Sequence, residues 1–594
     1  MTEYVDSPDE ALNDMTEETE PSPGCRSHLV LDLGFSNTVV TLYDVVEGKY
    51  RFISRGSSLT TARAPWFDVN HGFRAAVNQI TESTGRIFIN SNGYLICPSR
   101  IDGTGIDCFG MVVSAADPLR TVLIGLLEDV SLASARKALK TIYGLEIDRF
   151  SLSDDRTEHS KLESLLKRNV DLAVIVGGSD GGSDERLLDH VDTLSIGLNL
   201  LDDFQRPRVI YAGNIDLREQ VLAELGEVSD VYMADNVRPT VDDEELDGLI
   251  GLLASTYARQ KISELPGIEG IRDLSSLPVL PTAHAFGGIT EYLAALHDGK
   301  VVGLDIGSGS VSLVVSDPGN VDLIVRSDLG LGAPMVNVLK NIGLTDIFSW
   351  TDGHTRATEV QDFIFNKSLM AQTVPQNNKE LILEQAIAGL LTKEIASGLA
   401  TGRHLTENGI LKSIKLLVLR GGILSKSPSP GYPLLAAIDG LQPTGVFKVV
   451  LDSHDTLPAM GLLATHNPQL VVQVLDSGVL TDIGWVVVAS GQADIGTPVL
   501  RLSLEIEGMA TVQHEIKFGN LELIPIAAGK VADLTLQPAF RFDVGEGPGK
   551  RTTRRISGGT LGLLIDARGR PINVKGDEVT KRSHQQGWLK TVSS

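Results

Sequence analysis

Two short segments far apart in the chain each place an aspartate, a glycine and small polar side chains directly after an apolar run. Apolar residues resume after each segment, which predicts a buried strand, a tight turn and a returning strand. Glycine lets the backbone approach a phosphate closely, and successive N–H groups in a turn form an anion-binding concavity. The first segment contains Asp32, Gly34, Ser36, Asn37 and Thr38, and the second contains Asp305, Gly307, Ser308, Gly309 and Ser310.

The two aspartates are the candidate catalytic and metal-binding residues. A carboxylate at the mouth of a hairpin can hold a divalent cation through water. One such loop alone is more often an ordinary hairpin turn, but Asp32 and Asp305 have matching strand contexts and lie 273 residues apart (305 − 32). The recurrence of this loop predicts a duplicated domain that binds one nucleotide from both sides.

Size and charge restrict the function classes. A chain of 594 residues is too long for one core and predicts several domains. The formal net charge of −24 argues against a nucleic-acid partner or an anionic membrane surface. No apolar stretch approaches the roughly 20 residues that cross a bilayer, so no integral membrane segment is expected. With no secretory signal pattern, we expect a cytoplasmic protein.

Cysteine usage agrees with that location. The chain has only Cys25, Cys97 and Cys108, and their spacing matches no metal site. We therefore predict no disulfide framework.

The predicted secondary structure changes several times along the first half of the chain. Residues 1–27 are acidic and predict a disordered tail. Residues 114–145 have helical spacing, whereas strands, loops and helices alternate over 171–263 and predict a parallel α/β layer. The glycine-rich run 177–182 is either an anion cradle or a strand-to-helix turn, and the turn is favoured because no lysine follows it.

The second half repeats the pattern of the first. Strands are predicted over 301–315 and 321–326, and helices near 333–342 and 378–399. A further strand, 414–419, ends at Arg420, Gly421 and Gly422. Beyond about 466, short strands alternate with glycine turns, which predicts a separate β-rich domain.

The two aspartate loops and the strand-to-Gly-Gly turn together resemble the actin, sugar-kinase and heat-shock-chaperone ATPase superfamily. The resemblance implies an α/β fold with two ribonuclease-H-like domains and with ATP and Mg²⁺ in the cleft between them. It assigns the two aspartate loops to the phosphates, with Asp32 and Asp305 at the metal. It assigns Gly421 and Gly422 to the adenosine.

Motifs between the loops, and one just after the second loop, narrow the resemblance to the MutL family that is encoded beside adenosylcobalamin-dependent glutamate mutase. These motifs are Val176–Gly182, Tyr211–Asn214, Asp235–Pro239, Leu280–Thr282 and Val325–Gly330, in that order. The family implies an ATP-dependent chaperone or reactivating factor with a protein partner, and a cobalamin-dependent mutase is the candidate partner. It also places Asp328 and Gly330 near the terminal phosphate, where a helix N-terminus favours negative charge.

The resemblance covers about 28–465 and sets the predicted domain scheme. The scheme has the tail at 1–27, a first actin-like domain with an inserted α/β region at 28–300 and a second actin-like domain at 301–465. The β-rich domain at 466–594 lies beyond the usual end of the family, and Arg420 stands where a small residue is usual.

Two other functions stay open. An actin-like scaffold would use the nucleotide as a conformational lock for assembly, without a mutase partner. A small-molecule kinase would need a general-base aspartate between the loops, and the sequence singles none out.

Overall fold

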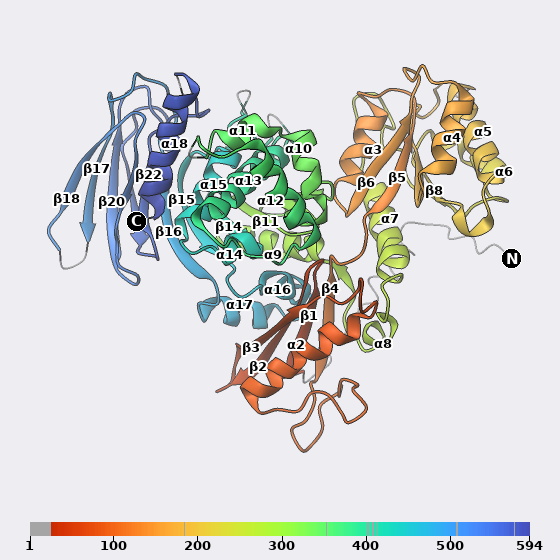
Figure 1. Cartoon of the computed structure of the whole chain (residues 1–594), viewed down its shortest axis with the longest axis horizontal. Helices are drawn as coiled ribbons and strands as arrows, with labels where there is room; N and C mark the ends of the chain where they lie inside the picture. Colours follow the sequence, from red (N-terminus) through yellow and green to blue (C-terminus); the bar gives the residue numbers. More distant parts are fainter. Residues whose placement is uncertain are drawn as a thin grey trace. The chain divides into compact units, whose positions relative to one another are not determined.

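The computed structural model describes residues 25–182, 185–351, 353–400, 403–406, 409–412, 414–506, 509–574 and 576–593, so most of the predicted acidic tail lies outside it. The fold is mixed α/β with several sheets (Figure 1). The chain divides into two compact units. The smaller unit contains Thr61–Asn70 and Val113–Pro281, and the larger unit contains Cys25–Thr60, His71–Val112 and Thr282–Ser594.

The larger unit begins with the first predicted hairpin, which the structure confirms. Strands β1 (His28–Leu33) and β2 (Asn37–Val46) pair antiparallel, and β3 (Lys49–Leu59) pairs with β2. Strand β4 (Cys108–Val113) lies on the other side of β1, and helix α2 (Val69–Thr84) separates β3 from β4 in the chain. All six residues of β1 are buried, as its apolar composition predicts.

The second hairpin opens an eight-stranded sheet with the order β13-β12-β11-β14-β15-β16-β22-β19. Strands β11, β12 and β13 form an antiparallel meander, and β14 and β15 add in parallel beside β11. The predicted strands near 301–315, 321–326 and 414–419 are thereby confirmed. The bounds are β11 (Val301–Ile306), β12 (Val311–Asp317), β13 (Asn320–Arg326), β14 (Leu416–Arg420) and β15 (Gly445–Leu451).

Three strands from beyond residue 466 extend this same sheet. Strand β16 pairs with β15, β22 pairs with β16, and β19 closes the edge. The remaining strands form a four-stranded sheet with the order β18-β17-β20-β21. The bounds are β16 (Thr481–Val488), β17 (Pro498–Ile506), β18 (Val512–Lys517), β19 (Leu521–Ile524), β20 (Val531–Pro538), β21 (Thr552–Ser557) and β22 (Gly562–Asp566).

Helices cover the eight-stranded sheet, and those between residues 333 and 441 share one buried core with it, together with α18. Helix α13 packs against β12 and α15, and α18, near the C-terminus, packs against α15 (Figure 1). Helix α9 packs against β11, β12 and α16. The bounds are α9 (Thr282–Leu296), α10 (Val338–Asn341), α11 (Leu344–Phe348), α12 (Ala357–Leu369), α13 (Asn378–Ala396), α14 (Gly422–Ser425), α15 (Gly431–Leu441), α16 (Leu457–Ala464), α17 (Pro468–Asp476) and α18 (Glu578–Ser593), with a 3₁₀ turn at Ala333–Asn337.

The smaller unit contains a five-stranded, all-parallel sheet with the order β6-β5-β7-β8-β9, which confirms the predicted parallel layer. Helix α3 packs against α7, and α4, α5 and α6 pack in sequence, so helices cover both faces (Figure 1). The glycine-rich run after β7 leads toward α5. The bounds are β5 (Leu119–Ile124), α3 (Ser131–Leu139), β6 (Gly144–Phe150), α4 (Glu158–Lys167), β7 (Leu172–Ile175), α5 (Glu185–Asn199), β8 (Arg208–Tyr211), α6 (Arg218–Leu225), β9 (Val231–Met233), α7 (Asp247–Tyr257), α8 (Glu269–Arg272) and β10 (Leu280–Pro281).

Two expectations from the sequence are wrong. Residues 114–145 do not form one helical stretch, because β5 (Leu119–Ile124) precedes α3. A short fully apolar run fits a buried parallel strand as well as a helix, and here the sheet decides. Cys25 and Cys108 form a disulfide, with Cα atoms 6.1 Å apart. Spacing along the chain does not reveal that the start of β4 lies beside the residues that lead into β1.

No helix among the described residues is long and apolar enough to cross a membrane.

The crossing of α9 and α16 depends on Gly461. A Cβ atom at Gly461 would lie 1.8 Å from the carbonyl oxygen of Ala285, whereas one at Gly288 would come no closer than 3.8 Å to any neighbour. We expect Gly461→Ala to lower the free energy of unfolding by about 1–3 kcal/mol through overpacking. Gly288→Ala is the matched control and should be neutral or stabilising, since alanine favours a helix. Chemical unfolding of both variants checks this, and equal midpoints would contradict it.

Candidate functional site

Strand register brings a positive charge to the second aspartate loop. Asp305 is the next-to-last residue of β11, and Arg420 is the last residue of the parallel strand β14. The two residues are register partners, so their side chains leave the same edge of the sheet together. Asp32 holds the equivalent next-to-last position in β1.

The Arg420 guanidinium joins the two aspartates. Its Nη2 donates to Oδ2 of Asp32 at 2.5 Å, and its Nη1 donates to Oδ2 of Asp305. Arg420 and Asp32 are both more than nine-tenths buried. Side chains 388 and 115 residues apart along the chain therefore meet at one cation. We call Asp32, Asp305 and Arg420 the central triad.

Burial and charge act against each other within this triad. Burial raises the pKa of Asp32 to about 6, and the positive charge of Arg420 only partly offsets that rise. Burial opposes the charged form of Arg420, but the carboxylates of Asp305 and Asp32 outweigh it and raise its pKa above the ordinary value. Arg420 is thus a permanent cation, while Asp32 gains its negative charge only in the range near neutrality.

Neighbouring groups hold the triad in place. Thr282, the first residue of α9, donates its hydroxyl to Oδ1 of Asp32 at 3.1 Å. Asp452 lies 3.8 Å from Nε of Arg420 and accepts from the backbone N–H groups of Thr456 and Leu457, each at 2.9 Å. Those N–H groups belong to the start of α16, where a negative charge is favourable.

The tips of the two predicted loops also touch. The Ser36 hydroxyl donates to the Ser308 hydroxyl at 2.8 Å. A Cβ atom at Gly309 would lie 2.8 Å from the ring of Phe35, so glycine permits this close approach. Each loop is closed by a matching backbone bond, from Gly34 N to Asn37 O at 3.0 Å and from Gly307 N to Ser310 O at 2.9 Å.

Not all the predicted residues face this meeting point. The Thr38 side chain is buried and bonds the hydroxyl of Thr60 at 3.0 Å. Asp328 accepts two bonds from Arg326, at 2.7 and 2.6 Å, so a partner already matches its charge.

Gly330 lies against the second loop, because a Cβ atom there would be 2.8 Å from Ser308 O. Gly421 and Gly422 directly follow the central cation. Gly421 has a φ of +103°, and a Cβ atom there would lie 2.2 Å from Ile306 O. A Cβ atom at Gly422 would meet nothing within 4 Å, so the space beside this residue is open.

The predicted Mg²⁺ does not fit this arrangement of donors. Carboxylate oxygens suit Mg²⁺ chemically, but Arg420 engages Asp32 and Asp305 at the position where a shared cation would lie. Asp305 Oδ1 is the only carboxylate oxygen of the described triad that is buried without a hydrogen-bond partner. Across the described ranges, no group of three or more His, Cys, Asp or Glu residues could hold a metal ion.

Family comparison gives an independent result. A family model described as MutL protein matches residues 28–479. The chain belongs to the MutL family. A curated relative, Protein MutL of Clostridium tetanomorphum, is 22% identical over an alignment of 493 residues, and the alignment covers 76% of this chain and 98% of the relative.

Solved structures resemble this MutL family member only distantly. Nucleotide-free acetone carboxylase aligns with 83% of this chain and 81% of its own, at 12% identity and a TM-score of 0.33. Component A of (R)-2-hydroxyglutaryl-CoA dehydratase from Acidaminococcus fermentans aligns with 75% of this chain and 99% of its own, at 7% identity and a TM-score of 0.27. TM-scores below 0.5 establish no common fold.

The sequence pattern missed three residues of this MutL site. Arg420 stood out as a departure from the family pattern, but its pairing with both aspartates did not follow from its position. Thr282 lay within a family motif without a role. Asp452 directly follows the apolar strand β15, whereas Asp32 and Asp305 are the next-to-last residues of their strands.

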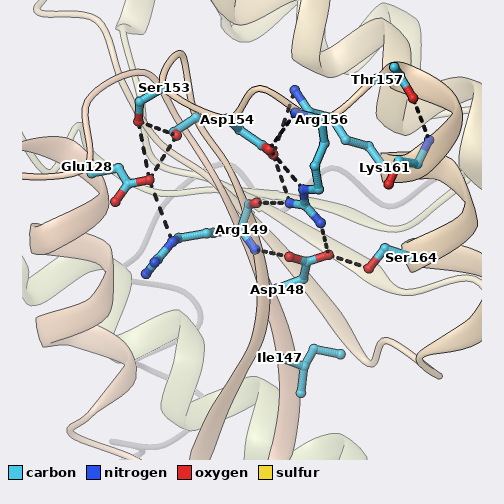
Figure 2. A network of polar contacts seen from close by, with 12 residues as sticks. Glu128, Ile147, Asp148, Arg149, Ser153, Asp154, Arg156, Thr157, Lys161 and Ser164 are labelled. Atoms are coloured by element: carbon cyan, nitrogen blue, oxygen red, sulfur yellow. Dashed lines mark hydrogen bonds and ion pairs between the residues drawn. The ribbon is translucent and has the colours of Figure 1, made fainter.

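A second polar cluster, in the smaller unit, has every charge matched (Figure 2). The Arg156 guanidinium reaches Asp148 at 3.0 Å and Asp154 at 2.8 Å, and Ser164 donates to Asp148. Glu128 accepts from Ser151 at 3.1 Å. These bonds tie the end of β6 to α4 and satisfy the cluster internally, so its role is structural.

Removing the central cation should destabilise the larger unit strongly. Arg420→Ala leaves two carboxylates facing each other without their partner, and we expect a loss of about 3–5 kcal/mol in the free energy of unfolding. The control is Arg501→Ala, because Arg501 pairs with Glu515 at 3.1 Å while its side chain is 77% exposed. That change should cost less than about 1 kcal/mol. Similar unfolding midpoints for the two variants would show that the triad adds little stability.

Proposed function

We propose that the larger unit binds ATP between the two aspartate hairpins and couples its hydrolysis to the state of a partner protein. The observation that carries the proposal is the meeting of Asp32 and Asp305 at one guanidinium, with Ser36 bonded to Ser308. Two loops suited to phosphate binding thereby approach each other within one compact unit. Membership of the MutL family is consistent with this assignment.

The finer fold assignment belongs to the same proposal. The order β13-β12-β11-β14-β15 begins with an antiparallel meander and continues with two parallel strands, and β3-β2-β1-β4 begins in the same way. We assign both to ribonuclease-H-like halves of an actin-like ATPase, within the predicted ranges 28–300 and 301–465. The matching position of the aspartate in β1 and β11 supports a duplication.

The chain's own groups suggest how the phosphates would be held. Backbone N–H groups of the two loops would bind phosphate oxygens, apart from those of Gly34 and Gly307, which close the turns. Gly330 packs against the second loop. The open space beside Gly422 would accept the nucleoside.

Asp305 is our candidate for orienting the attacking water. Its Oδ2 is fixed by Arg420, whereas its Oδ1 is buried and has no partner, so one acceptor oxygen is available. Asp32, with a pKa raised to about 6 by burial, would assist as a proton acceptor. In-line attack by water would then be driven mainly by positioning and charge.

The proposed function includes a partner protein. The family resemblance points to an enzyme that needs reactivation, and a cobalamin-dependent mutase is the candidate. Hydrolysis would change the relative populations of two states of the larger unit, and the partner would respond to that change.

Gly422 provides a test of nucleotide binding that leaves the protein intact. The Cβ atom of Gly422→Leu would meet no protein atom within 4 Å, and the rest of the side chain would enter the proposed nucleoside space. ATP affinity should therefore fall at least about tenfold, or about 1.4 kcal/mol. Gly587 in α18 also has nothing within 4 Å of its Cβ position, and Gly587→Leu is the control. Calorimetric titration of both variants measures the effect. Unchanged affinity in Gly422→Leu would remove the nucleoside assignment.

Asp305 provides a separate test of catalysis. Asp305→Asn keeps the shape of the side chain but loses the charged acceptor, and we expect ATP turnover to fall at least about 100-fold. Asp317→Asn is the control, since this residue ends the same hairpin and its side chain, which pairs with Lys300 at 3.7 Å, is 43% exposed. Phosphate release under saturating ATP reports the rate. Equal rates in the two variants would exclude Asp305 from the reaction.

A further inference from the structure

The central triad raises a question that the proposed function leaves open, namely which cation neutralises the carboxylates. Twin aspartates beside phosphate loops predict a divalent metal, yet the structure places a guanidinium there. An arginine differs from a metal because it is covalently part of the chain and always charged. The site therefore contains a positive charge before any ligand arrives.

Arg420 is bound from several directions, which argues against a mobile surface side chain. It is 8% exposed, and its Nη1 and Nη2 atoms each donate to a different aspartate. Its Nε is buried without a hydrogen bond, 3.8 Å from Asp452. Hydrogen bonds to ionised groups are about twice as strong as neutral ones, so this geometry is strongly preferred.

The other acidic side chains nearby have their own partners. Asp452 is held by the N–H groups that begin α16. Asp455 pairs with Arg55 at 2.5 Å. Asp32 and Asp305 instead take their charged hydrogen bonds from Arg420, one at each terminal nitrogen of its guanidinium.

We propose that Arg420 takes the place of the divalent cation in this site, so that a nucleotide binds here without Mg²⁺. This inference rests on the proposed function, because it concerns how the same phosphates are neutralised. The phosphates would meet loop N–H groups and the fixed guanidinium. A divalent ion could bind between Asp32 and Asp305 only if Arg420 were removed.

The first experiment uses Mn²⁺ alone and needs no nucleotide. The wild-type protein should bind no Mn²⁺ at the triad, as measured by the loss of the free-ion signal in electron paramagnetic resonance. Arg420→Met removes the charge but keeps much of the volume, and it should bind Mn²⁺ at least about tenfold more tightly, because two buried carboxylates then lack a counter-ion. The double variant Arg420→Met/Asp305→Asn should lose this gain.

The second experiment uses the wild-type protein and stays informative if Arg420→Met does not fold. ATP titrations in excess EDTA and in excess Mg²⁺ should give affinities within about threefold of each other, because the guanidinium of Arg420 supplies the positive charge in both buffers. Nucleotide binding that disappears in EDTA would overturn the inference while leaving the proposed function intact. Absence of binding in both buffers would instead overturn the proposed function.

The Mn²⁺ measurement also decides the inference without nucleotide. Tight Mn²⁺ binding by the wild-type triad, lost in Asp305→Asn, would show that a metal coexists with Arg420 and would overturn the inference. Failure of folded Arg420→Met to gain Mn²⁺ would do the same, because the carboxylates would then not form a cation site.

Discussion

The larger unit depends on one buried ion cluster, in which a single guanidinium holds two carboxylates from distant parts of the chain. Taking charges out of water is costly unless each finds a partner with good geometry. Asp32 enters from β1, while Asp305 and Arg420 enter from the eight-stranded sheet. The cluster therefore fixes where the first hairpin must lie, since any other placement would leave a buried charge unmatched.

Strand register makes this cluster possible. Asp305 and Arg420 are direct partners in the parallel pair of β11 and β14. A slip of one residue would turn the side chain of Arg420 to the opposite face of the sheet. Gly421 then turns the chain sharply away, at a φ of +103°, so the backbone passes close to Ile306 without a clash. The ion pair of Arg420 and the close packing at Gly421 thus both require the same strand register in residues 416–422.

Local sequence patterns predict the two hairpins, but they do not predict the long-range contacts of the central triad. Apolar runs around Asp32 and Asp305 predict both hairpins, because strand and turn signals are local. The pairing of Arg420 with Asp32 joins residues 388 positions apart, and no periodicity in the chain encodes it. The apolar run Leu119–Ile124 is compatible with either a helix or a buried strand. Its pairing with β6 and β7 makes it a strand, and that pairing is not encoded locally.

The region after residue 479 is outside the family match, yet it is part of the same structural core. Strand β16 pairs with β15 and also with β22, so the sheet that carries Asp305 continues without a break into the C-terminal residues. Trp588 and Val592 of α18 belong to the same buried cluster as β11 and β14. Because exposing such a core costs about 25 cal/mol per Å² of apolar surface, the C-terminal strands and α18 stabilise the sheet on which the triad is built. These C-terminal residues therefore belong to the framework that positions Asp305 and Arg420.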